Sequence, residues 1–313
     1  MELVSIADVR AAADDVAGAV VRTPLLPTLW DDELWLKPEN LQPVGSFKLR
    51  GATHALARLD PAARSRGVVT HSSGNHGQAL AYAARAFGVP CTVVVPEGAP
   101  QVKVARMRAL GADVRLVPPA RRLAEAEQVV VDTGAVLVPP FDHPWIIAGQ
   151  GTVGLEIVAD LPDVDVVLVP VGGGGLSSGV ATAVKALRPS AAVVGVEPLL
   201  AADARDSLAA GEVVVWDVER TYRTCADGLR TNLSELTLAH LRDRLDGIVT
   251  VTEDEIVAAL GRLLGEARLV AEPSGAVALA ARLFHRDELP PGRTVVVVTG
   301  GNADPHVLAA ALG

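Results

Sequence analysis

The fold is decided by the stretch Val164-Asp165-Val166-Val167-Leu168-Val169-Pro170-Val171-Gly172-Gly173-Gly174-Gly175-Leu176-Ser177. Its first half is a nearly continuous apolar run, which predicts a strand buried on both faces. Four glycines follow, and the segment from Ser177 to about Leu187 predicts a helix. The backbone N–H groups of a glycine turn that opens a helix can close around a phosphate. We therefore expect a parallel sheet with a phosphate site at its edge.

The same alternation of apolar runs and Ala-rich segments continues in both directions. Further strands are expected at Gly67–Thr70, Pro90–Pro96, Asp113–Val117, Ala192–Val196 and Thr294–Thr299, and further helices at Ala52–Leu59, Gln78–Phe87, Val102–Leu110 and Arg122–Asp132. Strands covered by helices on both faces predict an α/β protein with two doubly wound lobes. We expect a large lobe from residues 1–66 and 145–313 and a small lobe from residues 67–144. The ligand site should lie between them, at the carboxyl ends of the strands.

Composition excludes several classes of function. The chain has 313 residues and a net charge of −9, with its basic residues scattered, so nucleic acid is not an expected partner. No apolar run reaches the roughly 20 residues of a membrane span, and the N-terminus does not resemble a signal peptide. The two cysteines, Cys91 and Cys225, exclude a disulfide framework and favour the reducing cytoplasm.

The glycine turn alone leaves alternatives open. A nicotinamide fingerprint is incomplete here, because Gly172 and Gly174 are followed by Ser177 and no acidic residue is suitably placed for a ribose. The chain also lacks the Gly-Lys-Ser/Thr of a nucleotide P-loop. A single phosphate is the better prediction. A nicotinamide-binding oxidoreductase, or a binding protein that uses the glycine turn alone, remains the alternative from another class.

Three further segments supply reactive and polar groups. Gly45-Ser46-Phe47-Lys48-Leu49-Arg50-Gly51 places a lysine among small and apolar residues, where it can lose its proton and form a Schiff base with an aldehyde cofactor. Ser72-Ser73-Gly74-Asn75-His76-Gly77-Gln78 offers an anion site after a strand, or else an ordinary helix cap. Thr299-Gly300-Gly301-Asn302 offers a hydroxyl to a heterocyclic nitrogen, or else a turn. Together with the glycine turn, they indicate a pyridoxal-phosphate enzyme acting on an amino acid.

From about Leu25 to Asp304 the chain resembles the fold-type II pyridoxal-phosphate enzymes, whose fold is that of the tryptophan synthase β subunit. The lysine motif, with Lys37-Pro38-Glu39-Asn40 before it, and the other three segments occur in the family's order. Their Ser-Phe-Lys and Asn-His-Gly forms resemble threonine/serine dehydratases and serine racemases more than cysteine synthases. The resemblance implies dehydration and deamination of L-threonine or L-serine to a 2-oxo acid and ammonia. Serine racemase and 3-hydroxyaspartate dehydratase are the alternatives on the same scaffold, and a homodimer is expected.

The resemblance also implies roles for individual residues. Lys48 would hold the cofactor and take the α-proton, and Ser73 would be the second catalytic residue, on the opposite face of the substrate. The implied cofactor-binding residues are Phe47, Lys48, Asn75, Gly172, Gly173, Gly174, Gly175, Leu176 and Thr299. The implied substrate-binding residues are Ser72, Ser73, Asn75, His76 and Arg122.

A metal site is implied as well. In Glu197-Pro198-Leu199-Leu200-Ala201-Ala202-Asp203 the two carboxylates have the spacing of the racemase-like site, where Glu197, the carbonyl of Ala201 and Asp203 would bind a divalent ion. Oxygen ligands of this kind suit Mg²⁺, Mn²⁺ or Ca²⁺. The alternative is a pair of surface acids beside the start of a helix.

Overall fold

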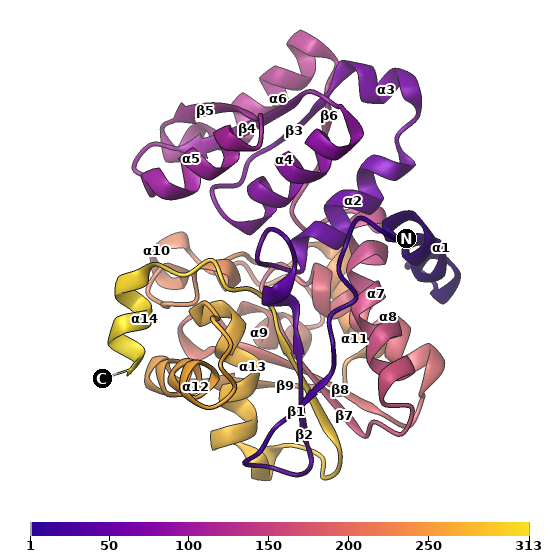
Figure 1. Cartoon of the computed structure of the whole chain (residues 1–313), viewed down its shortest axis with the longest axis vertical. Coiled ribbons are helices and arrows are strands. Elements are labelled where there is room, and N and C mark those ends of the chain that lie inside the picture. Colours follow the sequence, from indigo (N-terminus) through magenta and orange to yellow (C-terminus); the bar gives the residue numbers. More distant parts are fainter. Residues whose placement is uncertain (1, 313) are drawn as a thin grey trace.

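The computed structural model describes residues 2–312, and its strands form two separate sheets (Figure 1). The larger sheet has the order β1-β2-β10-β7-β8-β9, in which only the pair β1–β2 is antiparallel. Its strands are β1 (Leu26–Pro27), β2 (Leu34–Pro38), β7 (Val166–Pro170), β8 (Ala192–Pro198), β9 (Gly247–Val251) and β10 (Thr294–Val298). The smaller sheet is parallel throughout, with the order β5-β4-β3-β6. Its strands are β3 (Val68–Thr70), β4 (Cys91–Pro96), β5 (Asp113–Val117) and β6 (Val136–Leu137).

Helices cover both faces of the larger sheet. In β10, Val296 and Val298 face one core with α12 (Glu253–Gly265) and α13 (Pro273–Phe284), while Val295 and Val297 face another with α7 (Pro144–Asp160) and α8 (Gly175–Leu187). All five residues of β10 are buried, so no face of this strand meets solvent. The remaining helices of this part are α1 (Ile6–Val16), α9 (Asp203–Ala210), α10 (Val218–Thr221), α11 (Glu235–Arg244) and α14 (Pro305–Leu312).

The smaller sheet is also covered on both faces. One core joins Val93 and Val95 of β4 to apolar side chains of α2 (Lys48–Arg58), α4 (Asn75–Phe87) and α5 (Gln101–Ala109). The other joins Val94 to α6 (Arg122–Thr133). The short helix α3 (Pro61–Arg66) lies beside this sheet at the top of Figure 1. The prediction of an α/β protein with two doubly wound sheets is therefore confirmed.

Two helix boundaries differ from the sequence prediction in a way that matters for the site. Helix α2 begins at Lys48 rather than after it, and α4 begins at Asn75 rather than at Gln78. Gly45, in the left-handed region with a φ of 72°, turns the chain just before α2. Lys48, Asn75 and His76 therefore lie on first helical turns, where backbone geometry fixes them more firmly than a loop would.

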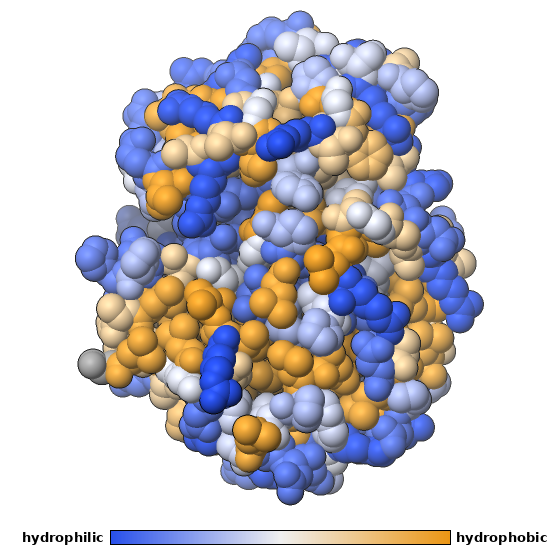
Figure 2. Space-filling model, viewed as in Figure 1, coloured by the Kyte–Doolittle hydropathy of each residue, from blue (hydrophilic) through white to orange (hydrophobic). Residues whose placement is uncertain are grey.

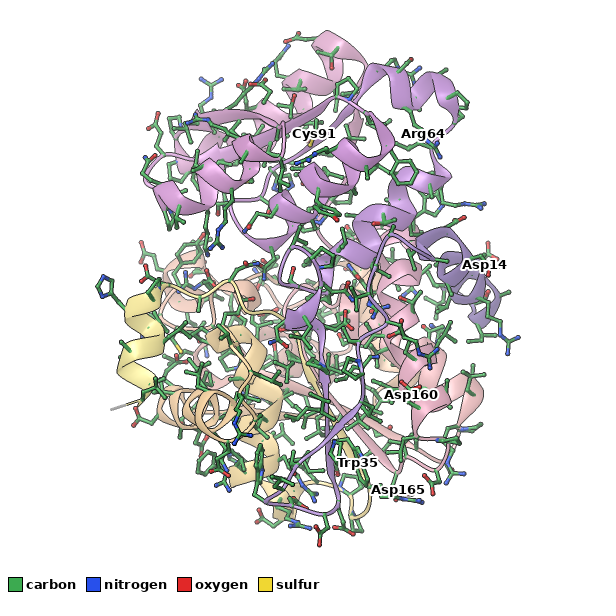
Figure 3. The ribbon with its side chains drawn as sticks, viewed as in Figure 1. Asp14, Trp35, Arg64, Cys91, Asp160 and Asp165 are labelled. Atoms are coloured by element: carbon green, nitrogen blue, oxygen red, sulfur yellow. The ribbon has the colours of Figure 1, made fainter. Side chains whose placement is uncertain are left out.

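Within residues 2–312, no helix is long and apolar enough to cross a bilayer. Figure 2 shows apolar residues gathered on the lower half, where α12 and α14 lie in Figure 1. The exposed apolar side chains of these two helices include Val257 and Leu312. In Figure 3, Cys91 is enclosed by the helices of the upper half, in agreement with its burial.

Candidate active site

The lysine motif and the turn after β10 are joined by backbone hydrogen bonds. The N–H of Phe47 donates to the carbonyl of Thr299 at 3.1 Å, and the N–H of Gly301 donates to the carbonyl of Gly45 at 2.9 Å. An isolated antiparallel bridge links Ser46 to Gly300 between these bonds. Two motifs some 250 residues apart in the sequence thus form one rigid edge, at the carboxyl ends of β2 and β10.

Lys48 differs from the other three lysines of the chain in having no carboxylate partner among residues 2–312. Lys37, Lys103 and Lys185 each form an ion pair. The Nζ of Lys48 instead donates to the carbonyl oxygen of Pro140 at 2.7 Å and lies 5.0 Å from the ring centre of Phe47. Burial without a counter-charge lowers the pKa of Lys48 to about 8. Roughly a tenth of this amine is therefore uncharged at pH 7, far more than for an ordinary lysine, and can react as a nucleophile.

This pKa gives a first prediction. The rate at which apoenzyme takes up pyridoxal phosphate should rise with pH and level off above about pH 8, since only the neutral amine reacts. An ordinary lysine, with a pKa of about 10.4, would show a rate that still climbs at pH 10. The measurement is the growth of the visible absorption band after mixing, divided by the rate for a lysine derivative under the same conditions to remove the cofactor's own titration. A ratio that falls steadily from pH 8 to pH 10 agrees with the lowered pKa, and a constant ratio contradicts it.

The glycine turn lies against the segment that holds Lys48. Gly174, with a φ of 84°, is the N-cap of α8, a conformation that favours glycine. A Cβ on Gly173 would lie 2.5 Å from the ring of Phe141, so a side chain there has no room. Phe141 directly follows Pro140, the acceptor for Lys48. Phe141 therefore connects the acceptor of Lys48 to the glycine turn.

The polar turn after β3 presents a second helix N-terminus to the same region. The hydroxyl of Ser72 accepts from the N–H of Gly74 at 3.3 Å, and Ser73 is half-buried beside it. His76 is buried, its Nε2 lies 3.0 Å from the carbonyl of Val138, and burial and the nearby Lys48 lower its pKa to about 3. A neutral His76 is suited to a hydrogen bond rather than to proton transfer near pH 7.

Two other predicted residues have partners of their own. The hydroxyl of Thr299 is buried and donates to the carbonyl of Ser274 over a long 3.3 Å, so it can turn towards a ligand. The Nε of Arg122 donates to the carbonyl of Pro119 at 3.2 Å. Burial lowers the pKa of His71, the neighbour of Ser72, and the charge of Arg122 lowers it further. Arg122 therefore lies near the polar turn after β3.

The predicted metal ligands lie together behind the glycine turn. Both oxygens of Glu197 accept backbone N–H groups, from Ala204 at 3.0 Å and from Arg205 at 2.8 Å. Asp203 accepts from the N–H of Leu233 at 3.3 Å, and its Oδ1 has no partner among the described atoms. Burial and the nearby Asp203 raise the pKa of Glu197 well above its usual range, and burial raises the pKa of Asp203 to about 7. Within residues 2–312, no three His, Cys, Asp or Glu side chains form a metal cluster, so backbone oxygens would have to complete this site.

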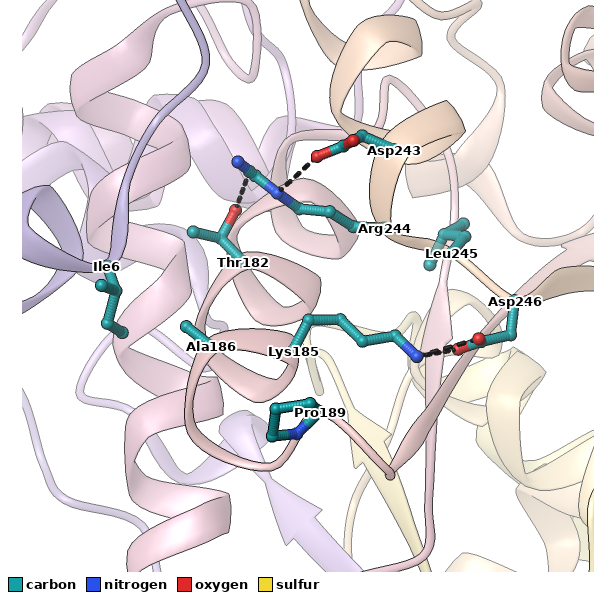
Figure 4. A pocket seen from close by; sticks show the side chains of 9 residues that line it. All are labelled: Ile6, Thr182, Lys185, Ala186, Pro189, Asp243, Arg244, Leu245 and Asp246. Atoms are coloured by element: carbon teal, nitrogen blue, oxygen red, sulfur yellow. Dashed lines mark hydrogen bonds and ion pairs between the residues drawn. The ribbon is translucent and has the colours of Figure 1, made fainter.

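One cavity in the described chain lies away from these residues. It has a volume of about 510 Å³ and lies at the carboxyl end of α8, about 15 Å along the helix from the glycine turn at 1.5 Å per residue (Figure 4). Lys185 there is paired with Asp246 and Arg244 with Asp243. Because its charges are paired with one another, this cavity offers no free cation to a phosphate.

Sequence reasoning missed three residues of the site. Pro140 and Phe141 were in a loop that no pattern could place, and Glu272 precedes a proline at a helix start, where an acid usually signals only a cap. The structure places Glu272 against Asn75, whose Nδ2 donates to Oε1 of Glu272 at 2.5 Å. No sequence signal could have indicated this contact, because the two residues are 197 positions apart.

The residues present fit pyridoxal phosphate. An unpaired amine with a lowered pKa suits its aldehyde, and a glycine turn at the start of a 13-residue helix suits its phosphate. Thr299 and Asn75 offer hydrogen bonds to a heteroaromatic ring. Phe141 lies against Gly173 and directly follows the acceptor of Lys48, and Thr299 bonds to the neighbour of Lys48, so these groups belong to one region of the fold.

Comparison with known proteins agrees with this chemistry. The profile of the family described as "Pyridoxal-phosphate dependent enzyme" matches residues 16–300. A putative threonine dehydratase of Sinorhizobium fredii is 43% identical, over 96% of this chain and 92% of its own length. The serine racemase of Dictyostelium discoideum is 39% identical, over 97% of this chain and 96% of its own. The crystal structure of a T.th. threonine deaminase has a TM-score of 0.91 and 44% identity, and covers 96% of this chain and 99% of its own. In agreement with its lysine, its glycine turn and its fold, this chain belongs to the fold-type II pyridoxal-phosphate dependent enzymes.

Proposed function

We propose that this enzyme converts L-threonine or L-serine to a 2-oxo acid and ammonia. The observation that carries the proposal is the setting of Lys48. It is the one lysine without an ion pair among residues 2–312, and its Nζ donates to Pro140, next to the glycine turn. The reaction removes water across the Cα–Cβ bond, and hydrolysis of the product then releases ammonia. The similarity of this chain to threonine dehydratases and a threonine deaminase supports this substrate class.

Each residue of the site is assigned a separate role in the reaction. Bound pyridoxal phosphate withdraws electrons from the substrate's α-carbon and so makes its α-proton acidic. Nζ of Lys48 would hold the cofactor and, once displaced by the substrate's amino group, would accept that proton. The backbone N–H groups of Gly172–Gly175 and Leu176 would bind the phosphate, and Phe47 would lie beside the ring. Substrate-carboxylate binding falls to Ser72, Ser73, His76 and Arg122.

Thr299 favours elimination over transamination. A neutral hydroxyl opposite the ring nitrogen does not hold that nitrogen protonated, as an aspartate would. With pyridoxal phosphate bound, less negative charge would be drawn from the α-carbon into the ring, which would favour prompt loss of the β-hydroxyl. Thr299 is therefore assigned to the ring nitrogen, and Asn75 to the ring hydroxyl.

The substrate is tested by measuring 2-oxo acid and ammonia release from L-threonine, L-serine, D-serine and the isomers of 3-hydroxyaspartate. We expect the highest kcat/KM for L-threonine or L-serine. The highest value for a 3-hydroxyaspartate isomer would assign the enzyme to that substrate instead. Inversion of serine without 2-oxo acid would assign it to racemisation.

We further propose that Glu197, the carbonyl of Ala201 and Asp203 bind a divalent cation, with Mg²⁺, Mn²⁺ or Ca²⁺ as the ion. Burial raises the pKa of both carboxyl groups, and repulsion by the nearby Asp203 raises that of Glu197 further, so ionising both without a cation is costly. A divalent ion would offset that repulsion, and the unpartnered Oδ1 of Asp203 is free to ligate it.

This site predicts that Mg²⁺ or Mn²⁺ raises the melting temperature by several degrees. A ligand that binds only the folded state adds about 2.7 kcal/mol at a hundredfold excess over its Kd. Because the ion needs ionised carboxylates, the rise should shrink as the pH falls below about 7, the pKa of Asp203. Asp203→Ala should remove most of the rise, whereas Asp206→Asn, a nearby acid that pairs with Arg205, should keep it. An equal rise in Asp203→Ala would assign the effect to another place.

We also infer the setting in which the enzyme works. Residues 67–144 are proposed as a small lobe, and residues 1–66 and 145–313 as a large lobe. A homodimer is proposed as the assembly, to be checked by light scattering after gel filtration. The cytoplasm is the proposed compartment, in keeping with the two unpaired cysteines.

A further inference from the structure

Asn75 is held on both sides of its carboxamide by residues from the other end of the chain. Its Nδ2 donates to Oε1 of Glu272 at 2.5 Å, and its Oδ1 accepts from Nδ2 of Asn302 at 2.8 Å. Glu272 is the N-cap of α13, and Asn302 follows the turn after β10. The two contacts therefore tie the start of α4, beside the smaller sheet, to the edge of the larger sheet that holds Lys48.

The direction of this hydrogen-bonded chain is fixed at both ends. An amide has a donor and an acceptor side of similar shape, so its orientation follows from its partners. The carbonyl of Val44 can only accept, and it takes the second hydrogen of Asn302 Nδ2 at 2.8 Å. The guanidinium of Arg106 can only donate, and it reaches Oδ1 of Asn302 at 3.2 Å. With Asn302 so oriented, Asn75 must turn its oxygen towards Asn302 and its nitrogen towards Glu272.

One hydrogen of Asn75 Nδ2 is left over by this arrangement. The other hydrogen goes to Glu272, and the oxygen is already engaged. A carboxamide held this way offers a donor, and not an acceptor, to a ligand beside it. That polarity suits an oxygen that carries negative charge, such as the ring hydroxyl of pyridoxal phosphate after loss of its proton.

Burial of the carboxyl group of Glu272 at this position is unfavourable for the stability of the fold. Glu272 is 4% exposed, and it forms no ion pair among residues 2–312, although the more distant charge of Lys103 lowers its pKa in part. Burial, with Asp227 nearby, raises the pKa of Glu272 to about 7. A buried carboxyl group without a cation lowers the stability of a fold, and such groups are more common at functional sites than in structural cores.

We propose that Glu272 is a positioning residue which, together with Asn302, orients the carboxamide of Asn75 so that its free N–H faces the cofactor ring. This inference rests on the proposed role of Asn75. Without the acceptor at Glu272, one of the two contacts that hold the carboxamide is lost, so Asn302 alone remains and the free N–H of Asn75 is no longer kept towards the ring.

The test compares two properties of the apoenzyme, its melting temperature and its equilibrium affinity for pyridoxal phosphate. Glu272→Met keeps the length of the side chain and removes the acceptor and the charge. We expect its affinity for the cofactor to fall about 10- to 100-fold, the range for one hydrogen bond with a charged partner. Its melting temperature should be unchanged or higher, because a buried carboxyl group is removed. Glu272→Gln, which still offers an acceptor, should recover most of the affinity.

Asp227→Asn is the matched control. It removes a nearby negative charge that contributes to the raised pKa of Glu272, but Asp227 has no hydrogen bond to Asn75 in the structure. Its affinity for pyridoxal phosphate should stay within about twofold of the wild type, since its partly exposed pair with Lys103 contributes little. Should Glu272→Met not fold, Glu272→Asp serves instead, because it keeps the charge but withdraws the acceptor by one methylene.

Three results would overturn the role of Glu272. The first is wild-type affinity for the cofactor in Glu272→Met, or in Glu272→Asp where that variant replaces it. The second is an affinity that falls only in proportion to the stability of the apoenzyme. The third is a loss of affinity in Asp227→Asn as large as that in Glu272→Met. A wild-type apoenzyme that takes up no cofactor at all would instead overturn the proposed function, so the two failures are distinguishable.

Discussion

Replacing Lys48 with alanine is expected to abolish 2-oxo acid formation from L-threonine and L-serine and to remove the visible absorption of the holoenzyme. Nζ of Lys48 is assigned both the attachment of the cofactor and the removal of the α-proton. The loss of a single acid–base group costs about 10²–10⁴-fold in rate, and here attachment is lost as well, so kcat should fall by at least that range. Lys48 makes no ion pair among the described residues, and burial disfavours its charge, so the melting temperature of the apoenzyme should change little.

Lys103→Ala is the control for this prediction. Lys103 also comes from an element beside the site and donates to a carboxylate, Asp227, across 3.0 Å. Its replacement should leave the absorption band in place and change kcat by far less. A Lys48→Ala enzyme that keeps both the band and measurable turnover would move the chemistry to another amine.

Ser73→Ala is expected to separate the two faces of the substrate. Racemisation needs a proton donor on each face of the planar carbanion, and with Lys48 assigned to one face, Ser73 is assigned to the other. Wild-type enzyme should therefore show some turnover of D-serine, with elimination still the main reaction. In Ser73→Ala, kcat/KM for D-serine should fall about 10²–10⁴-fold and that for L-serine much less.

The pair Ser72→Ala and Ser73→Ala makes this comparison more exact, because the neighbouring hydroxyl of Ser72 is assigned only to carboxylate binding. Ser72→Ala should raise KM for both enantiomers to a similar degree. Equal losses for D- and L-serine in Ser73→Ala would reduce Ser73 to the same role. A wild-type enzyme without any D-serine turnover would leave a dehydratase specific for L-amino acids.

Much of the fold could be predicted because the decisive signals are local. A strand that is apolar on both faces, such as Val166–Pro170, can only be buried between two layers of helices. A run of four glycines between such a strand and a helix is equally explicit. The helix Pro144–Asp160 was missed because it is buried nearly all round and lacks the polar face that marks an amphipathic helix.

The parts that could not be predicted depend on contacts between distant residues. Lys37, Glu39 and Arg50 look like surface charges in the sequence, but their side chains are fully buried. Arg50 bonds to Glu39 at 2.7 Å and to Glu156 at 2.7 Å, so the four charges balance within one cluster. This cluster anchors α2 two residues after Lys48. No local pattern indicates which acid will meet which base, and the same holds for Glu272 and Asn75.

The most direct test of the central claim is to find where the cofactor is attached. Borohydride reduction of the wild-type holoenzyme should fix a pyridoxyl group covalently, and peptide mapping by mass spectrometry should locate it. The chain has only four lysines, Lys37, Lys48, Lys103 and Lys185, so the outcome is unambiguous. We predict one label per chain, on Lys48. A label on Lys37, Lys103 or Lys185 with Lys48 unmodified, or no label at all, would contradict the assignment of this site.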